Sequence, residues 1–469
     1  MRSRGEALRP PSLVVPVTAL AAFLSPFMGS AFNLAVAALG AEFGAGAKQL
    51  GWVVTVYLLA TAACLLPWGR VADLRGREKV FLWGIALFDV SLLACALAPN
   101  LGFLVAARLV CGVAAAMVFG TMTAILVAYS PPGERGKRLG VNTAFVYAGL
   151  SAGPFVGGVI TQHLGWRWIF GASFLLGIIT LILGIVGLGA EARKEADSKV
   201  EYDLPGVLLS VVGISALLYA TSGSTLPAEV NHYLSLFGGV AVAGFLWWET
   251  RSNNPLLDVR LFTTNWGFAL SNLAALISYS GSFATSYVIS LYLQVARGLS
   301  PQAAGIVLLG QPVVQTLVSP LAGRLSDRLE PRVVASVGMT LTAVALGLMA
   351  LLPANGEFWR LILCLCLLGL GFGIFSSPNV NAIMSSAPRT HYGSASSILA
   401  LMRLLGQTLS MALAGIVLAY YLGNQPLNPA SAENLIRGVK GTLVVFCLLS
   451  ATGIPASLAR GRIHAEHSA

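Results

Sequence analysis

Long apolar runs recur from one end of the chain to the other, and they restrict its fold more than any other feature. Several exceed the roughly 18 residues that a membrane-spanning helix requires. Only 10% of the residues are charged, against about 25% in soluble globular proteins. Because lipid offers no partners for the backbone of an open strand, the runs are predicted to be helices. We therefore expect an all-α membrane protein.

Fourteen spans are predicted, in three groups. The first group comprises 13–40, 50–69, 80–98, 101–128, 139–162 and 168–189. The central pair comprises 204–222 and 231–249. The last group comprises 267–293, 302–323, 332–352, 359–384, 394–421 and 440–459.

Lys and Arg are divided unequally between the loops. Most of the 29 fall on the face that also holds the N-terminus, and two, Arg108 and Arg403, lie inside spans. Positive charge concentrates on the cytoplasmic side of membrane proteins, so both termini are expected there, in the inner membrane of a prokaryote. The net charge of +10 follows from these loops and not from a basic stripe, so no nucleic acid partner is expected.

Cysteine and histidine give no sign of a metal site or of a catalytic centre. All six cysteines lie inside apolar runs, and the five histidines fall in loops, span ends or the tail. No cluster of His, Asp or Glu gathers at one membrane face, as a membrane enzyme would require. We expect no enzyme activity, no metal and no cofactor.

One pattern occurs twice. The stretch LLPWGRVAD at 65–73 and the stretch VSPLAGRLSD at 318–327 both end a span and continue as Gly-Arg-apolar-small-Asp. Such repeats are typical of secondary transporters, whose substrate site lies between the halves. The sequence predicts two six-helix halves, 1–196 and 259–469, separated by a two-helix insertion at 197–258.

The first copy of the repeat continues as a charged loop with the skeleton Gly69, Asp73, Gly76 and Arg77. Glycines allow a tight turn near neighbouring helices, and Arg77 can pair with a carboxylate. We interpret the loop as a conformational latch, although an ordinary charged loop would also enforce topology. The second copy keeps Asp327 but has lost the later glycine and arginine, which predicts a weaker latch.

These stretches resemble the signature motifs of the major facilitator superfamily. Arg108 lies in AARLVCGVAAA, the fifth span carries GLSAGPFVGGVI followed by GWRWIF, and the eleventh carries SASSILALMRLLGQTLSMALAG. Together they resemble the fourteen-helix branch of drug:proton antiporters over nearly the whole chain. The resemblance implies alternating access driven by protons.

The fifth span carries five small or kinking residues that the resemblance associates with export. Small residues four positions apart lie on one helix face and allow close helix packing, and proline can kink the helix. Generic packing would give the same pattern without a directional meaning. The residues are Gly149, Gly153, Pro154, Gly157 and Gly158.

The first span departs from the resembled branch at one position. Many such exporters carry an acidic residue a few positions before an asparagine. Here Asn33 is present, but Met28 occupies the expected acidic position. Since an acid in the cavity suits cationic compounds, we expect neutral or anionic compounds to be favoured over strongly cationic ones.

Asp89 is the one acidic residue in the middle of a span. Counting at about 1.5 Å per residue from the turn near Pro99 places Asp89 and Arg108 at matching depth. Three interpretations stay open: an ion pair with Arg108, a proton-coupling carboxyl, or a packing carboxyl bonded to neighbours such as Ser91.

Further polar residues inside spans are candidates for a substrate cavity, since polar groups in lipid must face partners or water. Each of them can equally bridge two helices, and Arg403 can either pack or attract an anionic group. The candidates are Asn33, Tyr57, Asn142, Tyr147, Tyr279, Gln311, Gln315, Asn379, Arg403 and Gln407.

The expected function is proton-coupled efflux of small amphipathic compounds across a lipid bilayer by a monomer. The alternative is transport of a native metabolite or lipid without a role in drug efflux. A membrane enzyme and a sensor on a transporter scaffold are further alternatives that the sequence favours less.

Overall fold

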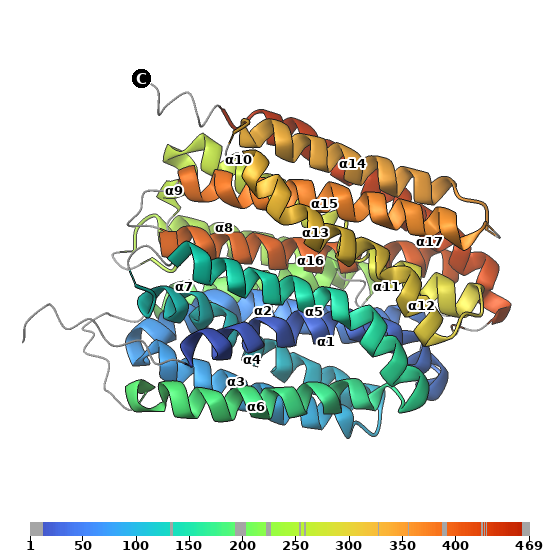
Figure 1. Ribbon diagram of the computed structural model, residues 1–469, viewed down its shortest axis with the longest axis horizontal. Coiled ribbons are helices and arrows are strands. Elements are labelled where there is room, and N and C mark those ends of the chain that lie inside the picture. The colour runs from blue at the N-terminus through green and yellow to red at the C-terminus, as the bar shows by residue number, and fades with distance from the viewer. Residues whose placement is uncertain are drawn as a thin grey trace, which may run out of the picture.

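The computed structural model describes residues 13–131, 135–192, 203–221, 227–252, 255–257, 259–326, 328–354, 356–386, 392–423, 425, 427 and 429–461. Within these ranges the secondary structure is helical and contains no strand. The helices lie side by side along the long axis of the molecule (Figure 1). The prediction of an all-α membrane protein is confirmed, because twelve helices are long and apolar enough to span a membrane.

Six helices form an N-terminal bundle, drawn in blue to green in Figure 1. Their bounds are α1 (Val14–Phe43), α2 (Ala47–Arg75), α3 (Arg77–Ala96), α4 (Leu101–Ala128), α5 (Arg135–His163) and α6 (Arg167–Ala192). We call the face at which α1 begins the near face, and the face at which it ends the far face. Close pairs in this bundle are α1 with α5, α2 with α4, and α3 with α4 and α6.

Glycines end two of these helices, and an asparagine side chain caps the start of a third. Gly44 closes α1 in a left-handed conformation with φ 61°, which glycine adopts without steric cost. Gly76 has φ 96° and separates α2 from α3. The Asn100 side chain accepts a hydrogen bond from the Phe103 backbone N–H and so caps the start of α4.

The C-terminal bundle, yellow-green to red in Figure 1, contains shorter and more broken helices. Its bounds are α9 (Arg260–Thr264), α10 (Trp266–Ser280), α11 (Thr285–Leu291), a π-helical turn (Tyr292–Ala296), α12 (Pro301–Leu308), α13 (Gly310–Ser326), α14 (Pro331–Leu351), α15 (Phe358–Ser386), α16 (Tyr392–Leu422), a short 3₁₀ turn (Pro429–Ser431) and α17 (Ala432–Leu458). The main pairs are α14 with α15 and α17, α13 with α15, and α10 with α16.

The predicted count of fourteen spans is not confirmed. Helices occupy all fourteen predicted segments within the described ranges, but two of them fall short of the length and hydropathy of a full span. One is α7 (Leu204–Thr221), which is short. The other is the segment predicted at 267–293, which breaks between α10 and α11 at residues 281–284. At that break the Ala284 backbone N–H donates to Ser410 Oγ at 3.0 Å.

The central pair, α7 and α8 (Ala228–Glu249), packs together and lies against α2 and α16. Trp52 of α2 and Tyr219 of α7 bring their rings to 5.0 Å. At the near face, Asp203 accepts hydrogen bonds from the Gly206 N–H and from Trp248 Nε1, at 3.1 and 2.8 Å. The inserted pair thus covers one line along which the two bundles meet.

Candidate functional site between the two bundles

The glycines of α5 form the contact surface between α5 and α1. A methyl group on Gly149 would lie 2.5 Å from the Phe23 carbonyl oxygen, and one on Gly157 would lie 2.6 Å from Ala31. Gly153 faces Ser30 in the same way. Such distances exclude any side chain unless the helices separate. The predicted close packing on this face of α5 is therefore present.

The adjoining residues of α5 face the C-terminal bundle instead. A methyl group on Gly158 would lie 2.6 Å from the Pro301 carbonyl oxygen and 3.0 Å from Gln302 Cα, at the start of α12. The carbonyl of Pro154 touches Gly305, one turn further along α12. The five motif residues thus serve two contacts, one inside the N-terminal bundle and one between the bundles.

Hydrogen bonds join the two bundles at the far face. Ser290 Oγ donates to the Asn33 carbonyl at 2.8 Å, and Gln294 Nε2 donates to the Leu34 carbonyl at 3.2 Å. The Gln302 N–H donates to Gln162 Oε1 at 3.3 Å. Asn33 was a candidate either to line a cavity or to bridge helices, and its backbone carbonyl here bonds to the other bundle.

Two further hydrogen bonds cross between the bundles nearer the middle of the helices. The hydroxyls of Ser151 and Thr316 lie 3.1 Å apart, and those of Tyr147 and Ser376 also lie 3.1 Å apart. We call this line of contacts, formed by α5 on one side and α12, α13 and α15 on the other, the seam. Its links are few and neutral, so each can break at modest energetic cost.

Arg108 is 1% exposed and lies inside the N-terminal bundle. Its Nε donates to the Val53 carbonyl at 3.1 Å, and its Nη1 lies 2.9 Å from Met28 Sδ. The guanidinium lies over the rings of Tyr57 at 4.4 Å and Phe32 at 5.0 Å. Among the described residues no carboxylate forms an ion pair with Arg108. The position where resembled exporters carry an acid is thus in direct contact with this cation.

Asp89 does not pair with Arg108 in the described structure, which corrects one interpretation of the sequence. Arg108 points from α4 toward α1 and α2, whereas the Asp89 carboxyl lies against Gly177 of α6. Neither carboxyl oxygen has a hydrogen-bond partner, although the residue is only 2% exposed. Ser91 donates to the Phe88 carbonyl instead, so the packing interpretation through Ser91 is also wrong. Counting along the helices gave depth but not the direction of the side chains.

The other cavity candidates lie in several different places. Tyr147, Tyr279 and Arg403 lie close together near the seam. The Arg403 guanidinium lies beside the Tyr279 hydroxyl, and Tyr147 is close enough to interact electrostatically with that hydroxyl. Gln407 lies one turn further along α16, half-buried. Buried oxygens of Asn142 and Gln311 have no hydrogen-bond partner among the residues that the structure describes. Gln315 is 5% exposed. Tyr57 is bonded to Ser25 at 2.5 Å inside the N-terminal bundle.

Asn379 has a structural role at the near face. Its Oδ1 accepts a hydrogen bond from Arg460 Nη1 at 2.6 Å, and Arg460 also bonds to Ser457 and to Ser271 Oγ. Burial lowers the pKa of the Arg460 guanidinium to about 10, so this group stays charged at neutral pH. The network ties the ends of α10, α15 and α17 together.

We expect Arg460→Leu to lower the free energy of unfolding by about 2–4 kcal/mol, because it leaves buried oxygens of Asn379 and Ser457 without a donor. Thermal melting of the purified protein should show this as a fall of several degrees in Tm. Arg251→Leu is the control, since Arg251 is exposed and its guanidinium lies over the Trp247 ring. Equal Tm values for the two variants would contradict a stabilising network.

The predicted latch is present only in part. Arg77 Nε and Nη2 donate to Asp73 Oδ1 at 3.0 and 2.9 Å, across the turn at Gly76. Both side chains are more than 40% exposed, and such pairs stabilise little. Gly69 lies beside Gly120 of α4, where the two helices approach closely. Asp327 lies outside the described residues.

A comparison with protein-family models decides the family. The model described as Major Facilitator Superfamily matches residues 18–250 and 272–464. The chain belongs to the major facilitator superfamily. It is an integral membrane transporter and not an enzyme.

Relatives of this facilitator include proteins named for different substrates. It is 30% identical over 400 residues to the riboflavin transporter RibZ of Clostridioides difficile (strain 630), covering 85% of this chain and 86% of that protein. It is 31% identical over 416 residues to the multidrug resistance protein Stp of Mycobacterium tuberculosis, covering 87% and 76%. It is 29% identical to the tetracenomycin C resistance and export protein of Streptomyces glaucescens, covering 85% and 74%. The facilitator therefore resembles the drug-efflux branch.

Solved structures agree with the fold. A bacterial homologue of the human lysosomal transporter Spinster, inward-facing and unoccupied, has a TM-score of 0.69 at 15% identity, covering 97% of this chain and 98% of that chain. A peptide transporter POT in complex with sulfate has a TM-score of 0.69 at 13% identity, covering 98% and 97%. At such identities the likeness shows the facilitator fold alone.

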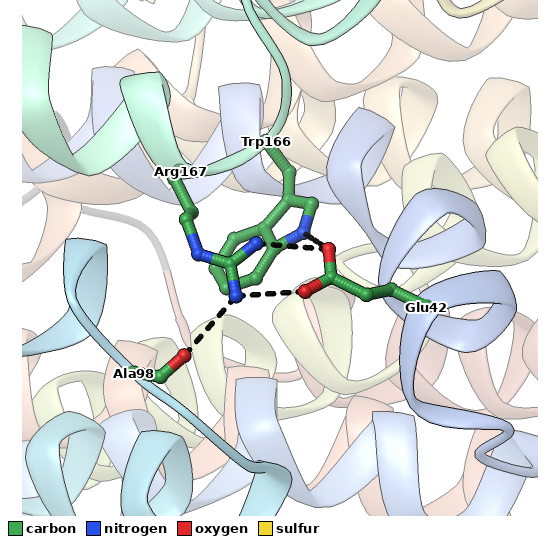
Figure 2. Close-up of polar contacts among 4 residues, drawn as sticks. All are labelled: Glu42, Ala98, Trp166 and Arg167. Atoms are coloured by element: carbon green, nitrogen blue, oxygen red, sulfur yellow. Dashed lines mark hydrogen bonds and ion pairs between the residues drawn. The ribbon is translucent and has the colours of Figure 1, made fainter.

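One polar cluster joins Glu42 to two residues of the GWRWIF stretch, a contact that the sequence did not predict (Figure 2). At the far face, Glu42 at the end of α1 binds Arg167 through both carboxylate oxygens, at 2.7 and 2.9 Å. Trp166 Nε1 donates to the same carboxylate at 2.7 Å, and Arg167 Nη2 reaches the Ala98 carbonyl at 3.2 Å. The cluster ties α1 to the turns before α4 and α6. Because Glu42, Ala98 and the adjacent pair Trp166 and Arg167 are separated from one another by more than 50 positions, no local pattern indicates their contact.

Proposed function

We propose that this facilitator exports small amphipathic compounds, neutral or anionic in preference to strongly cationic, in exchange for protons. The two bundles, corresponding to 1–196 and 259–469, would alternate about the seam, with 197–258 as a peripheral insertion. The near face would be cytoplasmic, as the Lys and Arg distribution favours, in the inner membrane of a prokaryote. We expect a monomer to suffice.

The observation that carries the proposal is the charge of the membrane interior. Arg108 and Arg403 lie in mid-span without an ion-pair partner among the described residues. Asp89, the one mid-span acid, faces α6. An interior with two cations and no facing carboxylate disfavours cationic compounds. The relatives named for resistance and export support export as the direction of transport.

Proteoliposomes with an imposed pH gradient and a pH-sensitive dye test the proposal. Anionic, neutral and cationic amphiphiles are added in turn, and we expect anionic or neutral compounds to collapse the gradient in protein-containing vesicles only. Substrate movement without proton movement would remove the antiport part and leave an uncoupled transporter. Collapse by cationic compounds alone would contradict the proposed selectivity.

The candidate for carrying the proton is Asp89, because it is the one carboxyl in mid-span. Asp89→Asn separates coupling from transport. If Asp89 carries the proton, the folded variant moves substrate without collapsing the gradient. Gradient collapse at the wild-type rate would exclude Asp89 from coupling while leaving the antiport proposal intact.

Transport of a native metabolite is the second candidate, and the similarity to a riboflavin transporter favours it. Radiolabelled riboflavin is therefore included among the compounds. Saturable riboflavin movement, with no response to the drug-like amphiphiles, would make this the leading function.

A further inference from the structure

Four side chains from both bundles meet midway along the seam. Tyr147 of α5 shares a 3.1 Å hydrogen bond with Ser376 of α15. The guanidinium of Arg403 in α16 lies beside the hydroxyl of Tyr279 in α10, and Tyr147 is within electrostatic reach of that hydroxyl. The ring of Phe372 meets the Tyr279 ring edge-on at 5.1 Å. We call Tyr147, Tyr279, Ser376 and Arg403 the central cluster.

The central cluster lies at one depth in the membrane. Each member is roughly ten to thirteen residues along its helix from the near-face end, which corresponds to about 15–20 Å. This is about half the thickness of the hydrocarbon core. Since its members come from α5 on one side of the molecule and from α16 and α10 on the other, the cluster spans the interior between the bundles.

The positive charge in the central cluster comes from Arg403. Arg403 is half-buried, and among the described residues no carboxylate forms an ion pair with it. A cation at this depth requires a partner or water. A guanidinium beside the Tyr279 hydroxyl, with the Tyr147 hydroxyl near that same tyrosine, presents several donors in one region, which is the chemistry that binds a carboxylate or a similar oxyanion. The aromatic rings of Phe372 and Tyr279 add apolar surface beside it.

We propose that the central cluster is the docking site for the anionic group of an amphipathic substrate. Arg403 supplies the charge, the hydroxyls of Tyr147 and Tyr279 donate hydrogen bonds, and the apolar part of the substrate packs on the rings. An oxyanion that takes the Tyr147 hydrogen bond replaces the link to Ser376 across the seam. Binding therefore loosens one contact between the bundles. The proposal deepens the proposed function and rests on it.

Binding to the purified protein tests the site apart from transport. Three fluorescent probes share one dansyl group and one linker but end in a carboxylate, a carboxamide or a trimethylammonium group. We expect the carboxylate to bind at least tenfold more tightly than the carboxamide. Arg403→Gln should remove that preference, and Arg403→Lys should keep most of it, because a hydrogen-bonded charge contributes about one to two orders of magnitude. Tyr147→Phe should lower carboxylate affinity severalfold.

Arg360→Gln is the matched control, since Arg360 is an exposed arginine at the far face, paired with Glu357 at 3.5 Å. Its probe affinities should equal those of wild type. Circular dichroism and melting curves show that each variant is folded. Should Arg403→Gln fail to fold, Arg403→Lys and Tyr147→Phe still test the site, and unchanged carboxylate affinity in Tyr147→Phe would count against it.

Each remaining outcome separates the site from the transport function. Carboxylate preference that persists in folded Arg403→Gln overturns the site, as does equal binding of carboxylate and carboxamide to wild type. Displacement of the carboxylate probe by millimolar chloride or sulfate, against gluconate as control, assigns the site to inorganic anions and overturns the substrate proposal. Arg403-dependent binding without movement of any probe into vesicles would support the site and refute the transport proposal.

Discussion

Gly158→Val should reduce transport more than tenfold while leaving the protein folded. Gly158 has no room for a side chain, because a methyl group would lie 2.6 Å from the Pro301 carbonyl oxygen of the other bundle. Overpacking of this kind costs about 1–3 kcal/mol. The cost falls only on the arrangement in which α5 and α12 touch at the far face. A penalty of about 2 kcal/mol shifts a two-state population by about thirtyfold toward far-face opening.

The population shift can be measured directly. Spin labels on cysteines introduced at Lys48 and Arg360, in a background without native cysteines, report the separation of the bundles at the far face. We expect longer distances in Gly158→Val. Gly140→Val is the control, since Gly140 lies on the same helix and has no atom within 4 Å of an added methyl group. Wild-type transport together with unchanged distances in Gly158→Val would show that this contact does not govern opening.

Met28→Glu should reverse the preference between anionic and cationic compounds. Met28 Sδ lies 2.9 Å from Arg108 Nη1, so a glutamate there can form a buried ion pair. The pair cancels one of the two mid-span cations. As an order of magnitude, two unit charges separated by about 10 Å in an effective dielectric of about 20 interact with about 1.7 kcal/mol. The affinity of an anionic probe should therefore fall about tenfold, and that of a cationic probe should rise by a similar factor.

Met28→Gln is the control for Met28→Glu, because it has nearly the same shape and adds no charge. Its selectivity should stay close to that of wild type. The same carboxylate, carboxamide and trimethylammonium probes provide the measurement, with the carboxamide as the internal reference. If Met28→Glu binds all three probes as wild type does, the charge beside Arg108 does not set selectivity.

The sequence predicted the helical framework well because span length and hydropathy are local properties. The start and end of α4 were predicted to the residue, and the α5 glycines were placed correctly on a contact surface. The break between α10 and α11 was missed, since its residues are as apolar as their neighbours. The break depends on support from Ser410, more than 120 residues away.

The sequence predicted the types of the site residues and their depth in the membrane, but not the directions in which their side chains point. An ion pair between Asp89 and Arg108 was one of three open interpretations, and the two side chains point to different neighbours because helix rotation is set by tertiary packing. Arg403, Tyr147 and Tyr279 were selected individually, whereas Ser376, which completes their cluster, was not. A serine in an apolar helix usually bonds to its own backbone, so composition alone does not mark it.

The interruption between α10 and α11 gives the C-terminal bundle a mechanical joint. On one side of it, α10 carries Tyr279, which belongs to the central cluster. On the other side, α11 carries Ser290, which bonds to the N-terminal bundle at the far face. Two short rods joined at such a point bend at lower cost than one continuous rod. We therefore expect α11 to move with the far face while Tyr279 keeps its position in the central cluster, so that two pieces of one span serve opening and binding separately.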